Sequence, residues 1–259
     1  MASKAKDGFT ETVKTVVYAL LIAGVFRTLF FQPFYIPSGS MKDTLLIGDF
    51  LFVNKMAYGY SKYSCPFAIC PISGRIFGSD PERGDVVVFR HPANGQDFIK
   101  RLVGMPGDTV QMKDGRLIIN GEMLKVEPAG TFEEIYEPQG PNRQPPSCAN
   151  APVGMGGICQ SERYTETLPE GKTHDILNIG ERQLDNTPVY TVPEGEYFFM
   201  GDNRDNSQDS RVPLSVGGVG FVPKEYLIGR ADRVVFSSAG RSLFFFWTWR
   251  PDRFFKGIE

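Results

Sequence analysis

The 259-residue chain has only two histidines and no large excess of charge of either sign. Its net charge is −2 and its basic residues are scattered, which argues against a nucleic-acid partner. His91 precedes a proline in a turn, and His174 lies in a polar region rich in turns, so neither suits a Ser-His-Asp triad. No G-x-S-x-G pattern surrounds Ser40 either. These absences exclude the commonest forms of histidine-dependent serine chemistry.

Cysteine is also scarce, and the four that are present form two close pairs, Cys65 with Cys70 and Cys148 with Cys159. Neither pair has the C-x-x-C spacing of zinc or redox sites. Both pairs lie in loops rich in Pro and Gly, so we predict disulfides in an oxidising compartment, with Cys65–Cys70 the better candidate. Whether Cys148 and Cys159 are bonded stays open, and four free thiols in a reducing compartment are the alternative.

Amphipathic helical patterns are nearly lacking beyond the N-terminal region, and short strand patterns separated by turns take their place. Gly (28 residues) and Pro (19) are frequent and aromatic residues make up 13% of the chain, which favours many short strands. We therefore expect a mainly β, mostly antiparallel fold, with strands at 49–55, 85–90, 98–103, 109–112, 116–120, 187–192, 196–200 and 231–236.

The chain divides by composition into three parts. Residues 1–32 hold a cytoplasmic N-terminus and an apolar run, and residues 33–110 and 194–259 hold most of the strand patterns. Residues 128–195 are rich in Pro, Gly, Glu and Thr and have few apolar runs. We predict a core formed by 33–110 and 194–259, with a β-rich subdomain inserted at 111–193.

One long apolar run is present, at residues 13–31, and Arg27 interrupts it. As a helix it would be slightly shorter than the ~30 Å hydrocarbon core of a bilayer. Arg27 can snorkel to the interface, where aromatic side chains are also favoured, here Phe30, Phe31, Phe34 and Tyr35. No A-x-A-like site follows, so an uncleaved anchor is favoured over a cleaved signal peptide.

The charges around this run predict its orientation. Lys4, Lys6 and Lys14 precede the apolar part and few basic residues follow closely, so the positive-inside rule places the N-terminus in the cytoplasm and the body outside. An aromatic segment at 243–249 is too short to span a membrane. It suits either the membrane interface or a core strand.

The residues with the most chemical potential are Ser40, just beyond the apolar run, and Lys100. A serine hydroxyl is a weak nucleophile until a base takes its proton, and a lysine is such a base only when neutral. In a strand, Phe98, Lys100 and Leu102 share one face, so the amine would lie among apolar neighbours that lower its pKa. A solvated lysine on an edge strand is the alternative. Lys42, two residues after Ser40, is expected to be exposed and charged.

A polar loop at 200–211 is dense in Asp, Asn, Ser and Arg, which can hydrogen-bond to their own backbone. It lacks the D-x-D-x-D-G order of a calcium loop, so we expect no metal. We predict a rigid support, with Ser207 holding the lysine amine and Asp209 with Arg211 bracing the loop.

Four segments, taken together and in this order, give the chain its resemblance to a known family: IPSGSM with TLLIGDFLFVNK, RGDVVVF, FIKRLVGMPGD and GDNRDNSQDSR. The chain resembles the bacterial type I signal peptidases, which are membrane-anchored serine endopeptidases. The resemblance covers the core and the anchor well and the insertion poorly. It implies coiled antiparallel sheets, removal of signal peptides from exported preproteins after Ala-x-Ala-like sites, and no cofactor.

The resemblance also implies residue roles. Ser40 would be the nucleophile and Lys100 the general base. The Ser38 hydroxyl and the Ser40 N–H would form the oxyanion hole. Ser207 would orient the amine, with Asp209 and Arg211 as the structural pair behind it. Pockets for small P1 and P3 side chains would be lined by six residues, Ile36, Pro37, Met41, Leu45, Phe98 and Ile99.

The expected partners are signal-peptide-bearing preproteins and membrane lipid, and the chain is expected to be monomeric. The expected location is the bacterial inner membrane, crossed once, with the catalytic part in the periplasm. One departure from the family pattern is Lys42-Asp43, where a residue followed by proline is usual. Two alternatives remain: a narrower Ser/Lys processing peptidase of organelle membranes or conjugative transfer, and an inactive β-domain that binds exported chains.

Overall fold

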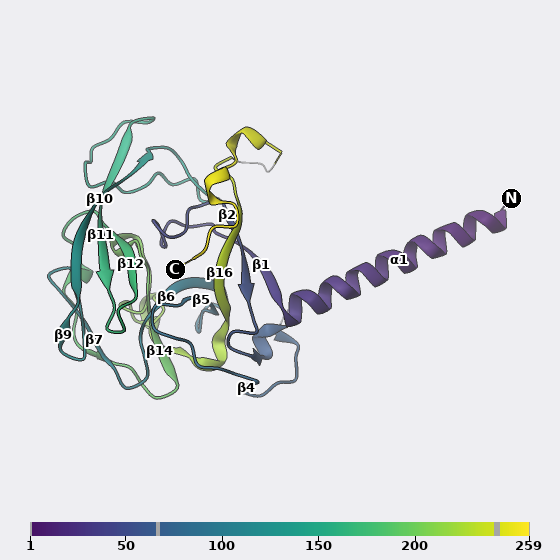
Figure 1. Cartoon of the computed structure of the whole chain (residues 1–259), viewed down its shortest axis with the longest axis horizontal. Coiled ribbons are helices and arrows are strands. Elements are labelled where there is room, and N and C mark those ends of the chain that lie inside the picture. Colours follow the sequence, from purple (N-terminus) through teal and green to yellow (C-terminus); the bar gives the residue numbers. More distant parts are fainter. Residues whose placement is uncertain (1, 66–67, 241–243, 259) are drawn as a thin grey trace.

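One long helix projects from a body of β-strands in the computed structural model, which describes residues 2–65, 68–240 and 244–258 (Figure 1). The helix α1 comprises Ala2–Leu29. Its part Gly8–Leu29 is long and apolar enough to cross a membrane by length and composition, and its most apolar window is not buried by the body. The helix ends earlier than the predicted run, because Phe31–Tyr35 pairs with a neighbouring strand instead.

The body is organised around a seven-stranded sheet in the order β1-β2-β16-β5-β6-β14-β15, antiparallel at every pairing. Irregular register in β16 opposite β2 adds twist, because bulges bend a strand. The predicted mainly β, coiled antiparallel fold is confirmed. The bounds are β1 Phe31–Tyr35, β2 Asp49–Asn54, β5 Val86–Arg90, β6 Asp97–Gly104, β14 Glu196–Met200, β15 Val222–Pro223 and β16 Leu227–Ser237.

Three smaller sheets complete the body, in the orders β13-β7-β8-β9, β10-β11-β12 and β3-β4. The first two are drawn on the side of the body opposite α1 (Figure 1). Their strands are β3 Tyr60–Ser61, β4 Arg75–Ile76, β7 Thr109–Lys113, β8 Arg116–Ile119, β9 Glu122–Met123, β10 Lys125–Ile135, β11 Ile158–Thr167, β12 Thr173–Asn178 and β13 Tyr190–Thr191. Short 3₁₀ helices lie at Lys62–Ser64, Gln183–Asp185, Arg204–Asn206, Leu214–Val216, Lys224–Tyr226, Phe246–Thr248 and Pro251–Arg253.

The central strand β5 explains how the core is divided. Successive side chains of a strand point to opposite faces. Val86 and Val88 accordingly join one apolar cluster, while Val87 and Phe89 join another on the other face of the sheet. The first cluster also takes in Ile36, Met41 and Leu45, which lie on either side of Ser40 in the sequence. The segment that carries Ser40 is therefore fastened to the sheet by its own apolar side chains.

Candidate active site

Ser40 and Lys100 come from segments 60 residues apart and meet in the structure. Ser40 lies in the turn that follows β1, and Lys100 lies in the middle of β6. The Lys100 Nζ donates a hydrogen bond to the Ser40 Oγ at 2.7 Å, and a second to the Ile99 carbonyl at 3.0 Å. Both side chains are buried.

Burial gives Lys100 an unusual acidity. Desolvation lowers the pKa of its ammonium from 10.5 to about 8, against the opposing charges of Asp209 and Asp202. The Phe98 ring contributes to this setting, with its centroid 5.5 Å from the Lys100 Nζ. About a tenth of the amine is therefore neutral at pH 7, against a negligible share for an ordinary lysine, and this neutral form is able to accept a proton.

The polar loop at 200–211 holds the backbone around Ser40. The Asn203 N–H donates to the Ser40 carbonyl at 3.1 Å, and its side-chain amide donates to the Gly39 carbonyl at 3.0 Å. The loop itself is braced by a fully buried ion pair, with the Arg211 Nε 2.9 Å from Asp209 Oδ1. Asp209 also accepts from the Gly201 N–H at 3.0 Å. The position of Ser40 is thus set by main-chain contacts to a rigid loop.

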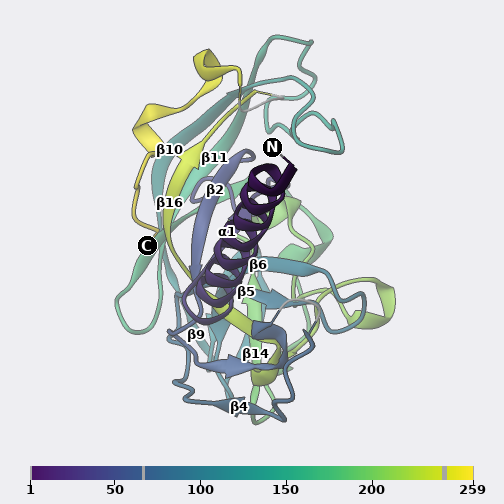
Figure 2. The ribbon, with the colours of Figure 1, turned by 90° about the vertical axis from the view of Figure 1, so that its right-hand side faces the viewer.

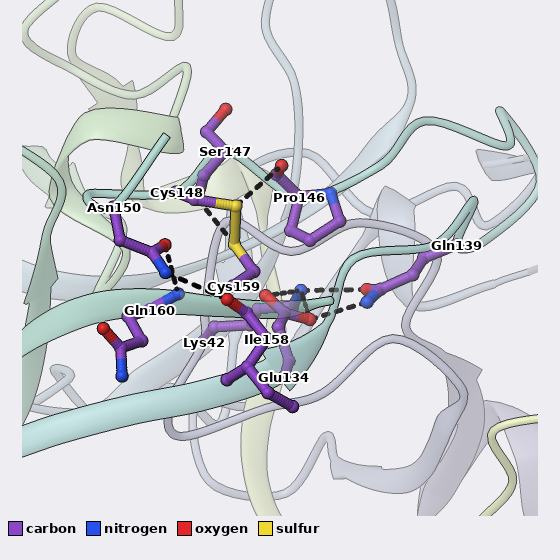
Figure 3. The surroundings of a disulfide bond; sticks show 10 residues. All are labelled: Lys42, Glu134, Gln139, Pro146, Ser147, Cys148, Asn150, Ile158, Cys159 and Gln160. Atoms are coloured by element: carbon purple, nitrogen blue, oxygen red, sulfur yellow. Dashed lines mark hydrogen bonds and ion pairs between the residues drawn. A yellow bond between two sulfur atoms is a disulfide. The ribbon is translucent and has the colours of Figure 1, made fainter. Parts of the chain in front are cut away.

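A second connection reaches the nucleophile turn from the insertion, through Lys42. This residue was expected to be exposed, but it is buried, with its Nζ 2.6 Å from Glu134 Oε2 and 2.9 Å from Gln139 Oε1 (Figure 3). The expectation failed because Glu134 comes from β10, a strand 92 residues away that the sequence pattern did not reveal. Burial lowers the pKa of Lys42, while Glu134 raises it.

Disulfides join Cys148 to Cys159 and Cys65 to Cys70. Cys159 stands opposite Glu134 in the pairing of β10 with β11, so the first disulfide lies beside the Lys42–Glu134 contact (Figure 3). It fastens the end of a loop whose residues Gln139 to Ser147 approach the nucleophile turn.

A cleft of about 710 Å³ opens over the Ser40–Lys100 pair. One side is formed by the nucleophile turn and the start of β6, and the other by the insertion loop and residues 205–208. Its apolar and small lining residues include Phe34, Pro37, Gly39, Ile47, Phe98, Ile99, Pro145 and Pro146. An extended peptide could therefore reach the hydroxyl with apolar surface on both sides.

Comparison with known proteins places this site in a family. The model described as "Signal peptidase, peptidase S26" matches residues 9–236. The chain belongs to the signal peptidase family, peptidase S26. A signal peptidase I of Rickettsia typhi (strain ATCC VR-144 / Wilmington) is 40% identical over 246 residues, covering 88% of this chain and 83% of the relative. A second, from Rickettsia prowazekii (strain Madrid E), is 39% identical over 242 residues, covering 88% and 82%.

A crystal structure of a signal peptidase I from Enterococcus faecalis V583 is 30% identical and covers 59% of this chain and 97% of that chain, with a TM-score of 0.30. Membership of the signal peptidase family confirms the resemblance stated from the four motifs. It likewise confirms the expectation of a serine endopeptidase, and it supports removal of signal peptides as the general activity.

One of the contacts that the resemblance implied is absent from this structure. In the part of the chain that is described, no hydrogen bond joins Ser207 to Lys100; the amine donates to the Ser40 hydroxyl and the Ile99 carbonyl. Ser207 is nevertheless buried beside the site, and its Oγ has no hydrogen-bond partner among the described residues. Ser38 is exposed and lines the cleft.

The six residues expected to form the substrate pockets divide into two groups. Pro37, Phe98 and Ile99 line the cleft. Ile36, Met41 and Leu45 are each at most 1% exposed and belong to the apolar cluster beneath the nucleophile turn, so they support the cleft rather than line it. Ile36, Met41 and Leu45 therefore flank Ser40 in the sequence as buried side chains that hold the nucleophile turn in place.

Sequence reasoning missed a buried charge network on the other face of β6. Arg101 donates from both its Nε and its Nη2 to the Asp202 carboxylate, at 2.8 Å each. Arg204 pairs in the same region with Glu166, which comes from β11 of the insertion. His174 lies against Glu166, and burial lowers its pKa to about 4, so this histidine is neutral. The one signal in the sequence was an arginine directly after Lys100 in an apolar strand.

Proposed function

We propose that this chain removes N-terminal signal peptides from exported preproteins, cutting after Ala-x-Ala-like sites with Ser40 as nucleophile and Lys100 as general base. The observation that carries the proposal is the 2.7 Å hydrogen bond between Lys100 Nζ and Ser40 Oγ. It joins a poor nucleophile to a buried amine whose pKa is lowered to about 8. Few other arrangements allow a serine to be activated without histidine.

The proposed reaction has two halves. The Ser40 hydroxyl gives its proton to the neutral Lys100 amine while Oγ attacks the scissile carbonyl carbon, and the resulting oxyanion accepts hydrogen bonds from the Ser40 N–H and the Ser38 hydroxyl. Collapse breaks the C–N bond, and Lys100 returns the proton to the leaving amine. Lys100 then takes a proton from water while the water oxygen attacks the acyl carbon; the C–Oγ bond breaks and Lys100 gives that proton to Ser40 Oγ, which restores the hydroxyl and the neutral amine.

The shape and lining of the cleft support a small-residue specificity. Pro37, Phe98 and Ile99 line the cleft next to Ser40. Small side chains such as alanine would fit against these apolar walls, whereas larger ones would collide with them. We assign the Ala-x-Ala preference to these walls.

Anchoring in a membrane is part of the proposal. The part Gly8–Leu29 of α1 is apolar and projects freely, and its preceding lysines favour a cytoplasmic N-terminus. The C-terminal aromatic segment adds a second contact; its first residue, 243, lies outside the described part. Phe244 is 90% exposed and Trp247 69%, and Figure 1 draws this loop in yellow on the same side of the body as α1. The body would be periplasmic, where disulfides form.

The test is cleavage of a preprotein whose leader ends in Ala-x-Ala by the purified full-length chain in detergent. Wild type should release the mature protein, while Ser40→Ala and Lys100→Met should lose the activity by several orders of magnitude. Lys42→Met is the matched control for the second lysine near the nucleophile and should keep measurable cleavage. Activity of Lys100→Met with loss in Lys42→Met would move the base to Lys42. Binding of the preprotein without cleavage by wild type would make the chain a binding module.

A further inference from the structure

A second cavity, of about 760 Å³, opens where α1 meets the body. Figure 2 views the body from the side on which the helix projects. The cavity is lined by Arg27 near the end of α1, Lys55 just after β2, Arg90 at the end of β5 and Asp97 at the start of β6. Asp97 also borders the catalytic cleft, and the two cavities are otherwise lined by different residues.

The charges in this cavity are unbalanced. Arg27, Lys55 and Arg90 bring three positive charges, against one negative charge from Asp97. The Asp97 carboxylate forms an ion pair with Arg90, with Asp97 Oδ1 3.0 Å from Arg90 Nη1. Burial, and to a smaller extent the charge of the nearby Arg27, lower the pKa of Lys55 to about 8. An anion entering the cavity would therefore meet a field with a net positive sign.

Lys55 provides an independent indication of a ligand. Its side chain is 1% exposed, and its Nζ donates to the Ser64 carbonyl at 2.6 Å. An ammonium has three donors, and among the described residues no carboxylate lies within 4.0 Å of it. A buried ammonium without an anionic partner is costly, and an anion in the cavity would remove that cost.

The position of the cavity relative to α1 indicates which anion is available. Arg27 is in the last turn of the apolar helix, two residues before it ends at Leu29. If α1 spans the bilayer as proposed above, this turn lies at the depth of the phosphates of the lipid head groups. Cations at that depth lie within reach of the phosphates of the lipids in the same leaflet.

We propose that this cavity binds the phosphate of an anionic phospholipid head group, contacted by Lys55 and Arg90 from the body and by Arg27 from the anchor. The site rests on the proposed membrane anchoring and is independent of the Ser40–Lys100 chemistry. It would lock the anchor helix and the body together through one lipid. Because Arg90 also holds Asp97, the phosphate competes with that carboxylate for the guanidinium.

The experiment uses the full-length chain in a neutral detergent, titrated with short-chain lipids and followed by thermal unfolding and native mass spectrometry. Dihexanoyl-phosphatidylglycerol should bind about tenfold more tightly than dihexanoyl-phosphatidylcholine, because its head group has a net negative charge, whereas the phosphate of phosphatidylcholine is neutralised by its own trimethylammonium group, which the cations of the cavity would repel. Glycerol 3-phosphate and inorganic phosphate are titrated in parallel as soluble phosphates without acyl chains. Binding of either as tightly as phosphatidylglycerol would overturn the lipid assignment and make this a site for a free phosphate.

The substitutions should change the preference for phosphatidylglycerol in opposite directions. Arg90→Gln and Lys55→Met should each remove most of the preference for phosphatidylglycerol. Asp97→Asn should strengthen it, because the competing carboxylate is lost. Lys125→Gln, an exposed lysine that does not line the cavity, is the matched control and should change nothing. If Lys55→Met fails to fold, Arg90→Gln and Asp97→Asn still decide, since both side chains are partly exposed. Equal affinity for the two lipids, or a preference unmoved by these variants, would refute the site.

Discussion

The Lys42 ammonium lies 2.6 Å from Glu134 Oε2, which ties the turn carrying the nucleophile to strand β10 of the insertion. The exposed fractions of the two side chains are 5% and 16%, so water screens the pair only weakly. Gln139 contacts both partners and extends the connection into the loop that borders the cleft. Strand β10 and the loop that follows it thereby contribute to the shape of the site.

Glu134→Gln should therefore reduce both stability and cleavage. The substitution leaves the Lys42 charge buried without its anion, which we expect to cost about 3 kcal/mol of unfolding free energy. Urea unfolding and preprotein cleavage measure the two effects. Glu127→Gln, in the same strand but in an exposed pair with Lys125, should cost no more than about 0.5 kcal/mol. The double variant Lys42→Met with Glu134→Gln should recover part of the stability; strict additivity of the two losses would contradict a direct pair.

The lowered pKa of Lys100 predicts a rise of activity with pH. The group is protonated and inactive well below a pKa of about 8 and neutral above it, so kcat/KM should increase about tenfold per pH unit at low pH and level off above about 8. A pH profile of kcat/KM for preprotein cleavage checks this. A profile that is flat from pH 6 to 10 would exclude Lys100 as the base.

The contribution of Lys100 to stability should also increase with pH. Because the unfolded lysine has its ordinary pKa near 10.5 and the folded one about 8, the unfolded chain binds more protons between these values, and Lys100 makes the fold more stable as pH rises through this window. The difference in unfolding free energy between wild type and Lys100→Met should therefore change between pH 8 and 10.5 in favour of wild type.

Asp209→Asn should shift the activity profile as well as weaken the fold. The Asp209 carboxylate raises the pKa of Lys100 against the effect of burial, so its loss should move the midpoint of the profile below that of wild type. The Arg211 partner is then left buried, at a cost of about 3 kcal/mol. The midpoint separates an electrostatic role from a purely structural one: a midpoint that stays in place or moves upward would contradict the assignment.

Gly201 is required by the close approach of three chain segments. A Cβ on this residue would lie 2.2 Å from Ser207 Oγ and 2.5 Å from the Ser40 carbonyl oxygen. Gly201→Ala should displace the nucleophile turn and lower kcat by about 100-fold, since displacements near 1 Å have such effects. Gly154→Ala, whose Cβ would meet no atom within 4 Å, is the control and should behave as wild type. Full activity of Gly201→Ala would show that the Ser40 position tolerates this movement.

The Cys148–Cys159 disulfide should matter for substrate binding more than for chemistry. It holds the end of the loop that borders the cleft, away from the Ser40–Lys100 pair. Replacing both cysteines by serine should raise KM severalfold and leave kcat nearly unchanged, because the reacting groups keep their positions. The Cys65→Ser/Cys70→Ser variant controls for the loss of a disulfide as such. A fall in kcat with constant KM would place the loop in the reaction itself.

The parts of the structure that the sequence predicted are those with local patterns. Strands such as β5 and β6 follow from compact apolar runs, and Lys100 among Phe98 and Leu102 already indicated a buried amine. Strands β10, β11 and β12 carry mainly polar side chains and stand partly in solvent, so neither periodicity nor apolar runs revealed them. The burial of Lys42 depends on one of these strands and could not be inferred without it.

The end of α1 illustrates a related limit. Aromatic residues after Arg27 suited a membrane interface, and the same residues also suit a strand. In the structure Phe31 pairs with Asn54 of β2, so these residues form a strand. This pairing partner lies in another segment of the chain, so the local sequence did not reveal it. Residues 31 and 32 accordingly lie in a strand of the body, although composition grouped them with the anchor.

The direct passage from α1 into β1 also has a geometric consequence. Only Phe30 separates the helix from a strand that is hydrogen-bonded into the main sheet, so no slack linker lies between them. If α1 spans a bilayer, this junction would hold Ser40 at a constant distance from the membrane surface. Signal peptides would then be selected by the number of residues between their hydrophobic segment and the scissile bond.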